Sequence, residues 1–326
     1  MGDIVVVTGS AEETVSPIEL LGESPAVVRA QALLRRAAAL ETPVLIVAEH
    51  GIDVECVVGE LQSGCLVTLA CGDDVSVVDR VLFGAAAAPR PTDLVTVGTE
   101  SRVAAARGGT LFLQDVTELP ATVQGRLARL ARDGEMLLDG QAVPANFRLV
   151  ASAPPSIERD VREHRFRPDL YRRIATSRID LPPLRDRLED LPALVRRIAG
   201  DYRDQHGGPG RSFTNAALAV MSALPWAGNL AELRGVIQRA LAQSADAVVQ
   251  IEQVLPSLQL DRSTTAFLPS GSLREARTRF ERDYIAAVLR YHGWKVAEAA
   301  HTLGIQRPNL YRKARQLGIP VNRIGD

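Results

Sequence analysis

The sequence has 326 residues, of which 46% are hydrophobic and 24% are charged. This length and balance suit a soluble protein of two or three globular units. No apolar run approaches the roughly 20 residues needed to span a bilayer, and no basic segment leads into an apolar one at the N-terminus. These features exclude a membrane protein and make the cytoplasm the expected location.

The formal net charge of −1 hides an uneven distribution. Residues 272–326 carry 11 basic and 5 acidic side chains, a net charge of +6, which leaves −7 on residues 1–271. Both lysines of the chain, Lys295 and Lys313, lie in the basic segment. The distribution predicts that contact with a polyanion is confined to the C-terminal part.

Residues 17–185 alternate short β-branched runs with helical patterns, after an N-terminal tail of residues 1–16. Alternation of strand and helix predicts a parallel sheet with helices on both faces, an α/β fold. The expected helices are 24–40 and 121–132, and the expected strands are 44–47, 66–70, 110–113 and 147–151.

Three cysteines, Cys56, Cys65 and Cys71, lie in this part of the chain without CxxC spacing or a nearby histidine cluster. This pattern favours buried free thiols over a metal site or a disulfide, and no metal is expected.

Residues 186–258 have only helical patterns, expected at 191–202, 215–224 and 229–243, and residues 259–271 read as a linker rich in small polar residues. Apolar residues from Leu273 to Tyr291 then recur at helical spacing. Two short helices, 296–303 and 307–317, follow across a turn at Gly304, with Pro308 in the first turn of the second. The segment 272–326 is therefore predicted to be an all-α helix-turn-helix domain.

Ordered landmarks in residues 17–258 resemble those of the bacterial enhancer-binding proteins, the AAA+ activators of sigma-54 RNA polymerase. This resemblance implies an AAA+ α/β subdomain at 17–185 and a helical lid at 186–258. The landmarks are Gly22-Glu-Ser-Pro25, Leu82-Phe-Gly84, Gly108-Gly-Thr-Leu-Phe-Leu113, Glu118-Leu-Pro120, Phe166-Arg-Pro-Asp-Leu-Tyr-Arg-Arg173, Leu181-Pro-Pro-Leu-Arg185 and Trp226-Ala-Gly-Asn229.

The family's phosphate-binding loop is altered in this chain. A GxxxxGK[ST] loop uses glycines to bring backbone N–H groups to the phosphates and a lysine to neutralise their charge. After the strand 44–47, Gly51 is the one family glycine that remains, Asp53 replaces the last glycine, and Val54 occupies the lysine position. An aspartate there repels phosphate. We expect no bound nucleotide and no other cofactor.

The second catalytic strand is altered too. The family ends it with Asp-Glu, where Asp helps to hold Mg²⁺ and Glu polarises the attacking water. Here these positions hold Gln114 and Asp115, and Ala153 and Ala231 replace a polar residue and an arginine that the resemblance implies. The chain is therefore predicted not to be an enzyme.

The loop that carries the sequence GAFTGA in the family and touches sigma-54 is also missing. Residues 85–94 read Ala-Ala-Ala-Ala-Pro-Arg-Pro-Thr-Asp-Leu instead. Direct remodelling of sigma-54 polymerase is not expected.

Arg167 and Arg173 match the region of the family's arginine finger, where a subunit reaches the γ-phosphate of its neighbour. One interpretation is a solvated ion-pair cluster with neighbouring charged residues. The other is that these arginines complete the active site of a different, ATP-competent subunit.

The C-terminal segment resembles the Fis-type DNA-binding domain, on residues such as Ala299-Ala300, Leu303-Gly304-Ile305 and Leu310-Tyr311. Because the start of a recognition helix enters the major groove, Gln306, Arg307 and Asn309 are candidates for contact with base edges. The candidates for phosphate contact are Arg312, Lys313 and Arg315. The alternative is that this segment is a solvated basic helix with a structural role only. Trp294, which replaces a small polar residue common in the family, is expected in the core or in a helix cap rather than as a base-stacking group.

Together these observations predict a transcriptional regulator that binds an inverted repeat in double-stranded DNA as a dimer or higher assembly. It would act at sigma-70-type promoters through self-association or through RNA polymerase. One alternative is an inactive subunit or antagonist of a related AAA+ activator. A divergent sigma-54-dependent activator is another, against which the missing lysine argues directly.

Overall fold

The computed structural model describes two compact units, Met1–Arg187 and Leu188–Asp326. The first is described over residues 17–62, 64–72, 77–84 and 94–187, and the second over 188–244 and 246–258. The C-terminal part is described at residues 285–286, 288–289, 292, 294–303, 306–317 and 319. The predicted linker, residues 259–271, and most of the predicted helix 273–291 lie outside these ranges.

A five-stranded parallel sheet forms the centre of the first unit, with the strand order β2-β4-β7-β1-β8. Every neighbouring pair is parallel, so the carboxyl ends of all five strands meet at one edge. The strands are β1 (Val44–Val47), β2 (Leu66–Ala70), β4 (Thr110–Gln114), β7 (Arg148–Ala153) and β8 (Ser177–Asp180).

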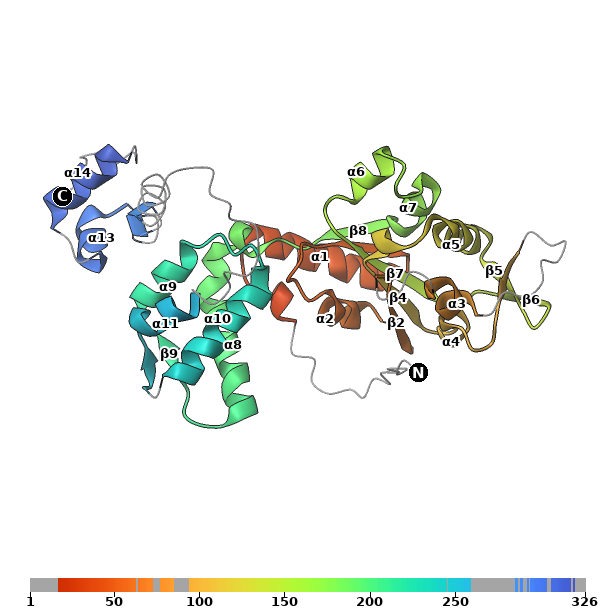
Figure 1. Ribbon diagram of the computed structural model, residues 1–326, viewed down its shortest axis with the longest axis horizontal. Coiled ribbons are helices and arrows are strands. Elements are labelled where there is room, and N and C mark those ends of the chain that lie inside the picture. Colours follow the sequence, from red (N-terminus) through yellow and green to blue (C-terminus); the bar gives the residue numbers. More distant parts are fainter. Residues whose placement is uncertain are drawn as a thin grey trace. The chain divides into compact units, whose positions relative to one another are not determined.

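Side chains of the central strands alternate between two hydrophobic cores, one on each face of the sheet. Leu45 and Val47 belong to the larger core, whereas Val44 and Ile46 belong to the smaller one. All four are at most 3% exposed. A strand buried on both faces needs an unbroken apolar run, which Val-Leu-Ile-Val supplies. This arrangement confirms the α/β fold predicted from the sequence (Figure 1).

Helix α1 (Pro25–Leu40) has a clear start in the sequence. The Ser24 hydroxyl accepts a hydrogen bond from the Val27 amide at 3.4 Å, and Pro25 fits the first turn. Ala30, Leu34 and Ala37 continue its buried stripe into the smaller core at helical spacing. The same core takes up the short helix α2 (Val54–Val58).

The larger core is closed by the helices on the other face. A small second sheet, in the order β3-β5-β6, extends this unit. The remaining elements are α3 (Val78–Phe83), β3 (Val95–Val97), α4 (Arg102–Ala105), α5 (Ala121–Asp133), β5 (Glu135–Leu138), β6 (Gln141–Pro144), α6 (Ile157–Arg162) and α7 (Pro168–Ile174).

The second unit begins with a helical domain. Trp226 is its largest buried side chain, and the indole Nε1–H donates to the Met221 carbonyl at 2.7 Å. A short parallel pair, β9 (Ser212–Phe213) with β10 (Val248–Val249), joins the helices. The helices are α8 (Leu191–His206), α9 (Asn215–Ser222), α10 (Asn229–Gln243) and α11 (Ile251–Leu258).

The C-terminal helix-turn-helix consists of α13 (Val296–Thr302) and α14 (Arg307–Gln316). Ala299, Leu310 and Ala314 are fully buried between them, and Val288 from the preceding segment joins the same core. The lid and this domain complete the fold class expected from the sequence. No helix within the described ranges is long and apolar enough to cross a membrane.

Candidate functional site

The positions of the family's nucleotide site gather at the carboxyl edge of the sheet. Strands β4, β7 and β1 are neighbours, and the turn after β1 hydrogen-bonds to the end of β7, where the Ala48 amide donates to the Ala153 carbonyl at 3.1 Å. Gln114 ends β4. Gly51 adopts a φ of 84° in this turn, a conformation that favours glycine. The structure therefore brings together the positions that the sequence selected on these three strands.

Asp53 occupies the anion-binding end of α2 with its own carboxylate. It is the N-cap residue, and its side chain accepts hydrogen bonds from the Cys56 amide at 3.4 Å and from the Cys56 thiol at 3.0 Å. In a phosphate-binding loop, the backbone N–H groups at this helix start would bind phosphate. Here they face a resident negative charge.

Val54 faces the hydrophobic core rather than the edge of the sheet. Its exposed fraction is 9%, and it belongs to the same core as Leu20, Ile52 and Val57. The lysine position of the family therefore contributes to packing in this chain and offers no positive charge to a ligand.

An ion pair joins this turn to Arg185, near the end of the first unit. Both guanidinium Nη atoms of Arg185 donate to the Glu49 carboxylate, at 2.7 and 2.6 Å. This pairing raises the pKa of Arg185. The Arg185 cation is thus already paired with a carboxylate of the altered loop.

Asp115, in the position of the catalytic glutamate, has a left-handed backbone with a φ of 54°. Its amide donates to the Ser152 hydroxyl at 3.0 Å, and its carboxylate is exposed. Gln114 is a neutral amide and a poor Mg²⁺ ligand. In the described part of the chain, no group of three or more His, Cys, Asp or Glu side chains could hold a metal ion.

The arginine-finger-like residues both have partners within the first unit. Arg167 makes two hydrogen bonds to the Asp169 carboxylate, at 3.0 and 2.7 Å, and this pair lowers the pKa of Asp169. Arg173 donates to the Ala131 carbonyl at 3.3 Å. The pairing of Arg167 fits the ion-pair interpretation, because that guanidinium is already engaged.

Residues 85–93, where the sequence lacks the GAFTGA motif, lie outside the described residues. The flanking backbone is closed by a hydrogen bond from the Gly98 amide to the Phe83 carbonyl at 2.8 Å. Arg126 braces this junction, because it donates twice to Asp79, at 2.8 and 2.7 Å, and once to the Thr96 carbonyl at 2.9 Å. The two ends of the segment are therefore held together from α5.

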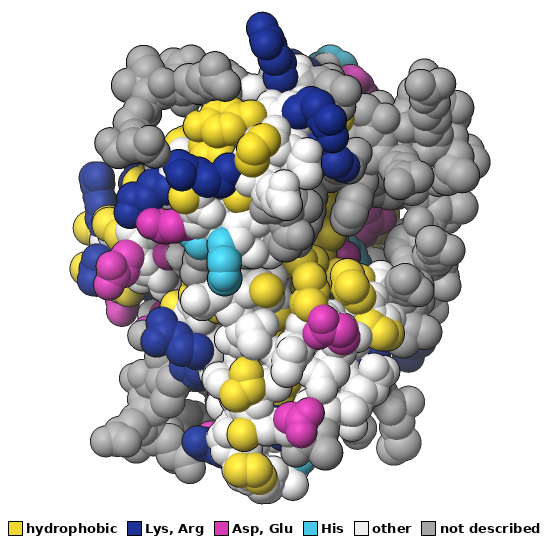
Figure 2. Space-filling view, turned by 90° about the vertical axis from the view of Figure 1, so that its left-hand side faces the viewer, with side chains coloured by type: hydrophobic (Ala, Val, Ile, Leu, Met, Phe, Trp, Pro, Cys, Tyr) yellow, Lys and Arg dark blue, Asp and Glu magenta, His cyan; other side chains and the backbone are white. Residues whose placement is uncertain are grey.

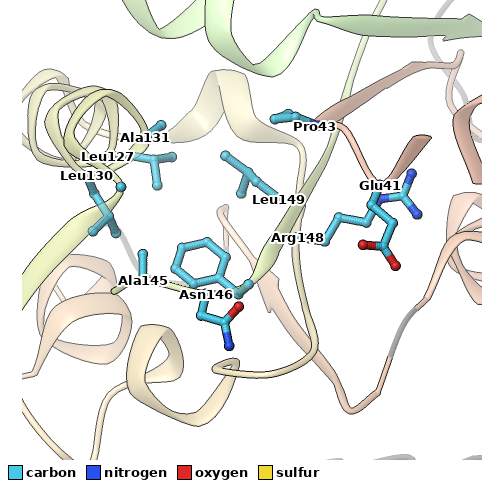
Figure 3. Close-up of a pocket in the computed structure, with 11 residues that line it drawn as sticks. Glu41, Pro43, Leu127, Leu130, Ala131, Ala145, Asn146, Arg148 and Leu149 are labelled. Carbon is cyan, nitrogen blue, oxygen red and sulfur yellow. The ribbon is translucent and has the colours of Figure 1, made fainter. Parts of the chain in front are cut away.

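A cavity of about 190 Å³ lies at the opposite end of β1 and β7 from the altered loop. Leu127, Leu130 and Leu149 line it, with Asn146 and Glu41 at its edge (Figure 3). The guanidinium of Arg148 is bound to three backbone carbonyls and is not offered to a ligand. The cavity does not coincide with the nucleotide positions.

Helix α14 presents the predicted DNA-contact residues at its start and along one side. Gln306 is the N-cap, and Arg307, Pro308 and Asn309 are all exposed, whereas the next residue, Leu310, is fully buried. The first turn is thus anchored on one side and open on the other, as a groove-reading helix requires. Figure 2 shows several Lys and Arg side chains exposed on the face that it draws.

The predicted phosphate contacts follow in the next turns of α14. Arg312 donates to the Asn309 side-chain oxygen at 3.3 Å, which links a phosphate candidate to a base-edge candidate. Arg312 and Arg315 are exposed and Lys313 is half-buried. The arrangement offers cations on successive turns of one short helix.

The structure distinguishes between the two positions expected for Trp294, the core and a helix cap. Its amide donates to the Leu289 carbonyl at 2.7 Å, which ends the preceding helix, so the expectation of a cap is confirmed. Of the two expected positions, core or cap, the residue takes the cap, and its side chain is 43% exposed. The signal available in the sequence was a large aromatic residue in a position where a small polar one is common.

A parallel AAA+-type sheet, a helical lid and a helix-turn-helix define a class, the AAA+-containing transcriptional regulators. Family comparisons agree in chain order. Residues 20–180 match the sigma-54 interaction domain, residues 185–267 the AAA+ ATPase lid domain, and residues 276–317 the bacterial regulatory protein, Fis family. The chain belongs to the family of DNA-binding transcriptional regulators of the sigma-54 activator type, which confirms the resemblance seen in the sequence.

Curated relatives include the alginate biosynthesis transcriptional regulatory protein AlgB of Pseudomonas aeruginosa. It is 32% identical to 92% of this chain, which spans 68% of its length. The nitrogen assimilation regulatory protein NtrX of Azorhizobium caulinodans is 32% identical over 66% of the chain and 50% of that protein. The chain therefore spans about half to two thirds of these relatives.

Among solved structures, NtrX from Brucella abortus in complex with ATP superposes with a TM-score of 0.70. The identity is 26%, and the match covers 91% of this chain and 69% of the NtrX chain. The two chains therefore share their fold over most of the length of this one.

Proposed function

We propose that this protein is a sequence-specific DNA-binding regulator whose AAA+ domain does not hydrolyse ATP. The observation that carries the proposal is the pair Asp53 and Val54. Asp53 places a carboxylate at the helix start where phosphate would bind. Val54 puts a buried apolar side chain in the position of the family's lysine. Either change alone weakens phosphate binding, because one adds a negative charge beside the site and the other removes the lysine that would neutralise the phosphates.

The DNA-binding part of the proposal rests on α14. Arg307 and Asn309 are exposed beside the buried Leu310, and arginine and asparagine form the specific bidentate contacts with guanine and adenine in the major groove. A two-fold dimer would read an inverted repeat with half-sites about one helical turn, roughly 34 Å, apart.

We infer that regulation takes place in the cytoplasm at sigma-70-type promoters, through self-association or through contact with RNA polymerase. The support is the sequence of residues 85–94, which contains no aromatic residue and no Phe-Thr pair of the kind that forms the tip of the family's sigma-54 contact. We place the AAA+ α/β subdomain at residues 17–185, the lid at 186–258 and the DNA-binding domain at 272–326.

A second candidate is an inactive subunit that assembles with an ATP-competent relative. Arg173 favours it, because a single 3.3 Å bond to the Ala131 carbonyl leaves most of its donors available. The bidentate Arg167–Asp169 pair argues against it. Mixing the purified chain with an active relative and measuring ATP hydrolysis separates the two candidates. Stimulation that is lost in Arg173→Ala would support the second, and unchanged hydrolysis would support the first.

The direct test measures ATP binding by calorimetry and DNA binding by fluorescence anisotropy on the same preparation. We expect no heat from ATP with Mg²⁺ at millimolar concentration, together with tight binding of a selected DNA site. Saturable ATP binding, or DNA binding that appears only when ATP is added, would contradict the proposal.

A further inference from the structure

Trp294 combines two features that rarely occur together. It is 43% exposed, the most exposed aromatic side chain among the described large hydrophobic residues, and its φ is 65°. A non-glycine residue in the left-handed region costs free energy, and the cost is highest for bulky side chains. The same backbone position would be satisfied by Gly or Asn without that cost.

Burial does not account for this strained tryptophan. The other tryptophan of the chain, Trp226, is 1% exposed and donates its indole N–H to a backbone carbonyl. Trp294 makes its described hydrogen bond through the backbone amide, which any residue type could provide. Strain retained without a packing reward points to a contact with another molecule.

The position of Trp294 indicates the partner. It directly precedes Lys295, the N-cap residue of α13, whose side chain is 70% exposed and pairs with Glu298 at 3.2 Å. α13 is the first helix of the helix-turn-helix, and the first helix crosses the DNA backbone while the second enters the major groove. An exposed aromatic and an exposed cation therefore stand together at the start of the helix that crosses the backbone.

We propose that Trp294 and Lys295 form a contact with the sugar–phosphate backbone of the bound DNA. The indole N–H donates to a phosphate oxygen and the ring packs on a deoxyribose. The Lys295 ammonium exchanges its exposed pair with Glu298, a contact of little strength in water, for a phosphate oxygen and provides the charge. This inference rests on the proposed DNA-binding function of α14 and adds a second DNA contact outside the recognition helix.

The two side chains should affect the salt dependence of DNA binding differently. Because the indole is neutral, it adds affinity without releasing counterions, whereas a lysine on a phosphate contributes roughly 0.9 to the slope of log K against log salt. Neither contact reads a base edge, so both act on operator and random-sequence DNA alike.

The test uses the full-length chain with Trp294→Asn, Trp294→Phe and Lys295→Ala. Asn suits the left-handed backbone, so the first variant should unfold at the same temperature as the native chain or higher. We expect Trp294→Asn to weaken binding of both DNA types about tenfold, the loss typical of a buried hydrogen bond to a charged group. Trp294→Phe should keep part of the affinity, and Lys295→Ala alone should reduce the salt slope.

Fluorescence gives an independent readout, because Trp294 and Trp226 are the two tryptophans of the chain. DNA should quench the native emission and leave that of Trp294→Asn, which reports Trp226 alone, unchanged. Equal affinity in Trp294→Asn with no quenching in the native chain would overturn the assignment. A loss confined to the operator would also overturn it, because that result means base reading.

The Arg307→Ala/Lys313→Ala variant distinguishes a failure here from a failure of the proposed function. If that variant binds DNA as the native chain does, the docking through α14 is wrong. If it loses binding while Trp294→Asn does not, docking through α14 stands and only the backbone contact fails.

Discussion

At the scale of single residues, two adjacent positions change what the loop after β1 can do. Asp53 supplies an anion where a ligand's anion would bind, and Val54 supplies a methyl-bearing side chain to the core. The electrostatic change and the packing change are physically independent. Reversing one of them therefore leaves the other in force.

Val54→Lys restores the family's lysine and tests this argument. Because the position is 9% exposed, we expect the ammonium to be forced toward an apolar core, at a cost of about 2–4 kcal/mol in unfolding free energy. Calorimetry should still detect no ATP binding, since Asp53 remains. The matched control is Val28→Lys on α1, which is 46% exposed and should change stability by less than about 0.5 kcal/mol. A stable Val54→Lys protein that binds ATP would refute this account.

Asp160 provides a pH-dependent test at the same scale. Hydrogen bonds from Arg165 and from the Ser156 hydroxyl lower the pKa of this carboxyl. A carboxyl with a depressed folded-state pKa stabilises the protein above its unfolded value, about 3.9, and the contribution is lost as pH falls through the folded pKa.

We therefore expect Asp160→Asn to lower the free energy of unfolding by about 1 kcal/mol at pH 7. The difference from the native chain should shrink as pH falls below about 4 toward the lowered folded pKa, as measured by denaturant titration across that range. A deficit that does not change with pH would mean that packing, and not the charge, is responsible.

At the scale of elements, the sequence was most informative where the elements are apolar and bounded by clear signals. The ranges expected for the β1 and β2 strands match those observed, and Ser24-Pro25 located the start of α1. β7 begins and ends slightly later than expected, since its last residues, Ser152 and Ala153, are buried but not strongly apolar. An apolar pattern alone could not extend the strand over them.

The elements that were missed are short or polar. β8 contains Ser177, Arg178 and Asp180 and lies at the edge of the sheet, so only Ile179 is buried and no apolar run marks the strand. α3 and α4 have six and four residues, too few for helical periodicity. Tertiary pairing and packing specify these segments, and one sequence does not show either.

Some residues of the candidate site could be predicted from the sequence and others could not. Motif spacing was sufficient to select Gln114, Asp115 and Val54, because the order of landmarks fixes the alignment with the family. Asp53 caps α2 through a local contact with Cys56, but that helix has only five residues, too few to show helical periodicity in the sequence. The pairing of Glu49 with Arg185 joins two segments that lie far apart in the sequence. These contacts became visible only in the fold.

Arg148 tests how far one residue can hold several elements together. Its guanidinium donates to the carbonyls of Ala37 and Leu61 at 2.7 Å and of Thr42 at 3.3 Å, and burial lowers its pKa. Arg148→Met would keep the aliphatic stem but leave buried carbonyl groups without this donor. We expect a loss of about 3 kcal/mol or more in chemical denaturation.

The control for this variant is Arg132→Met, where the guanidinium is 53% exposed and paired with the neighbouring Asp133. It should be nearly neutral. Equal effects of the two substitutions would show that the three carbonyl bonds do not set the stability of the α1, η2 (Gly59–Leu61) and β7 junction.

At the scale of the whole molecule, the change in net charge along the chain coincides with the boundary between the altered nucleotide positions and the DNA-binding segment. The segment 1–271 carries −7 and contains the altered nucleotide positions, whereas the segment 272–326 carries +6 and contains the recognition helix. We therefore expect DNA recognition to be independent of nucleotide. Arg307→Ala/Lys313→Ala should weaken operator binding by about 2 kcal/mol or more, since one good bidentate base contact contributes about 1–3 kcal/mol.

The most direct measurement of the central claim is a selection of genomic DNA fragments by the purified chain, sequenced with and without ATP and Mg²⁺. The Arg307→Ala/Lys313→Ala variant is carried in parallel. The account predicts the same discrete, palindromic sites under both conditions and their loss in the variant. Sites that appear only with ATP, or that persist in the variant, would contradict a nucleotide-independent regulator that reads DNA through α14.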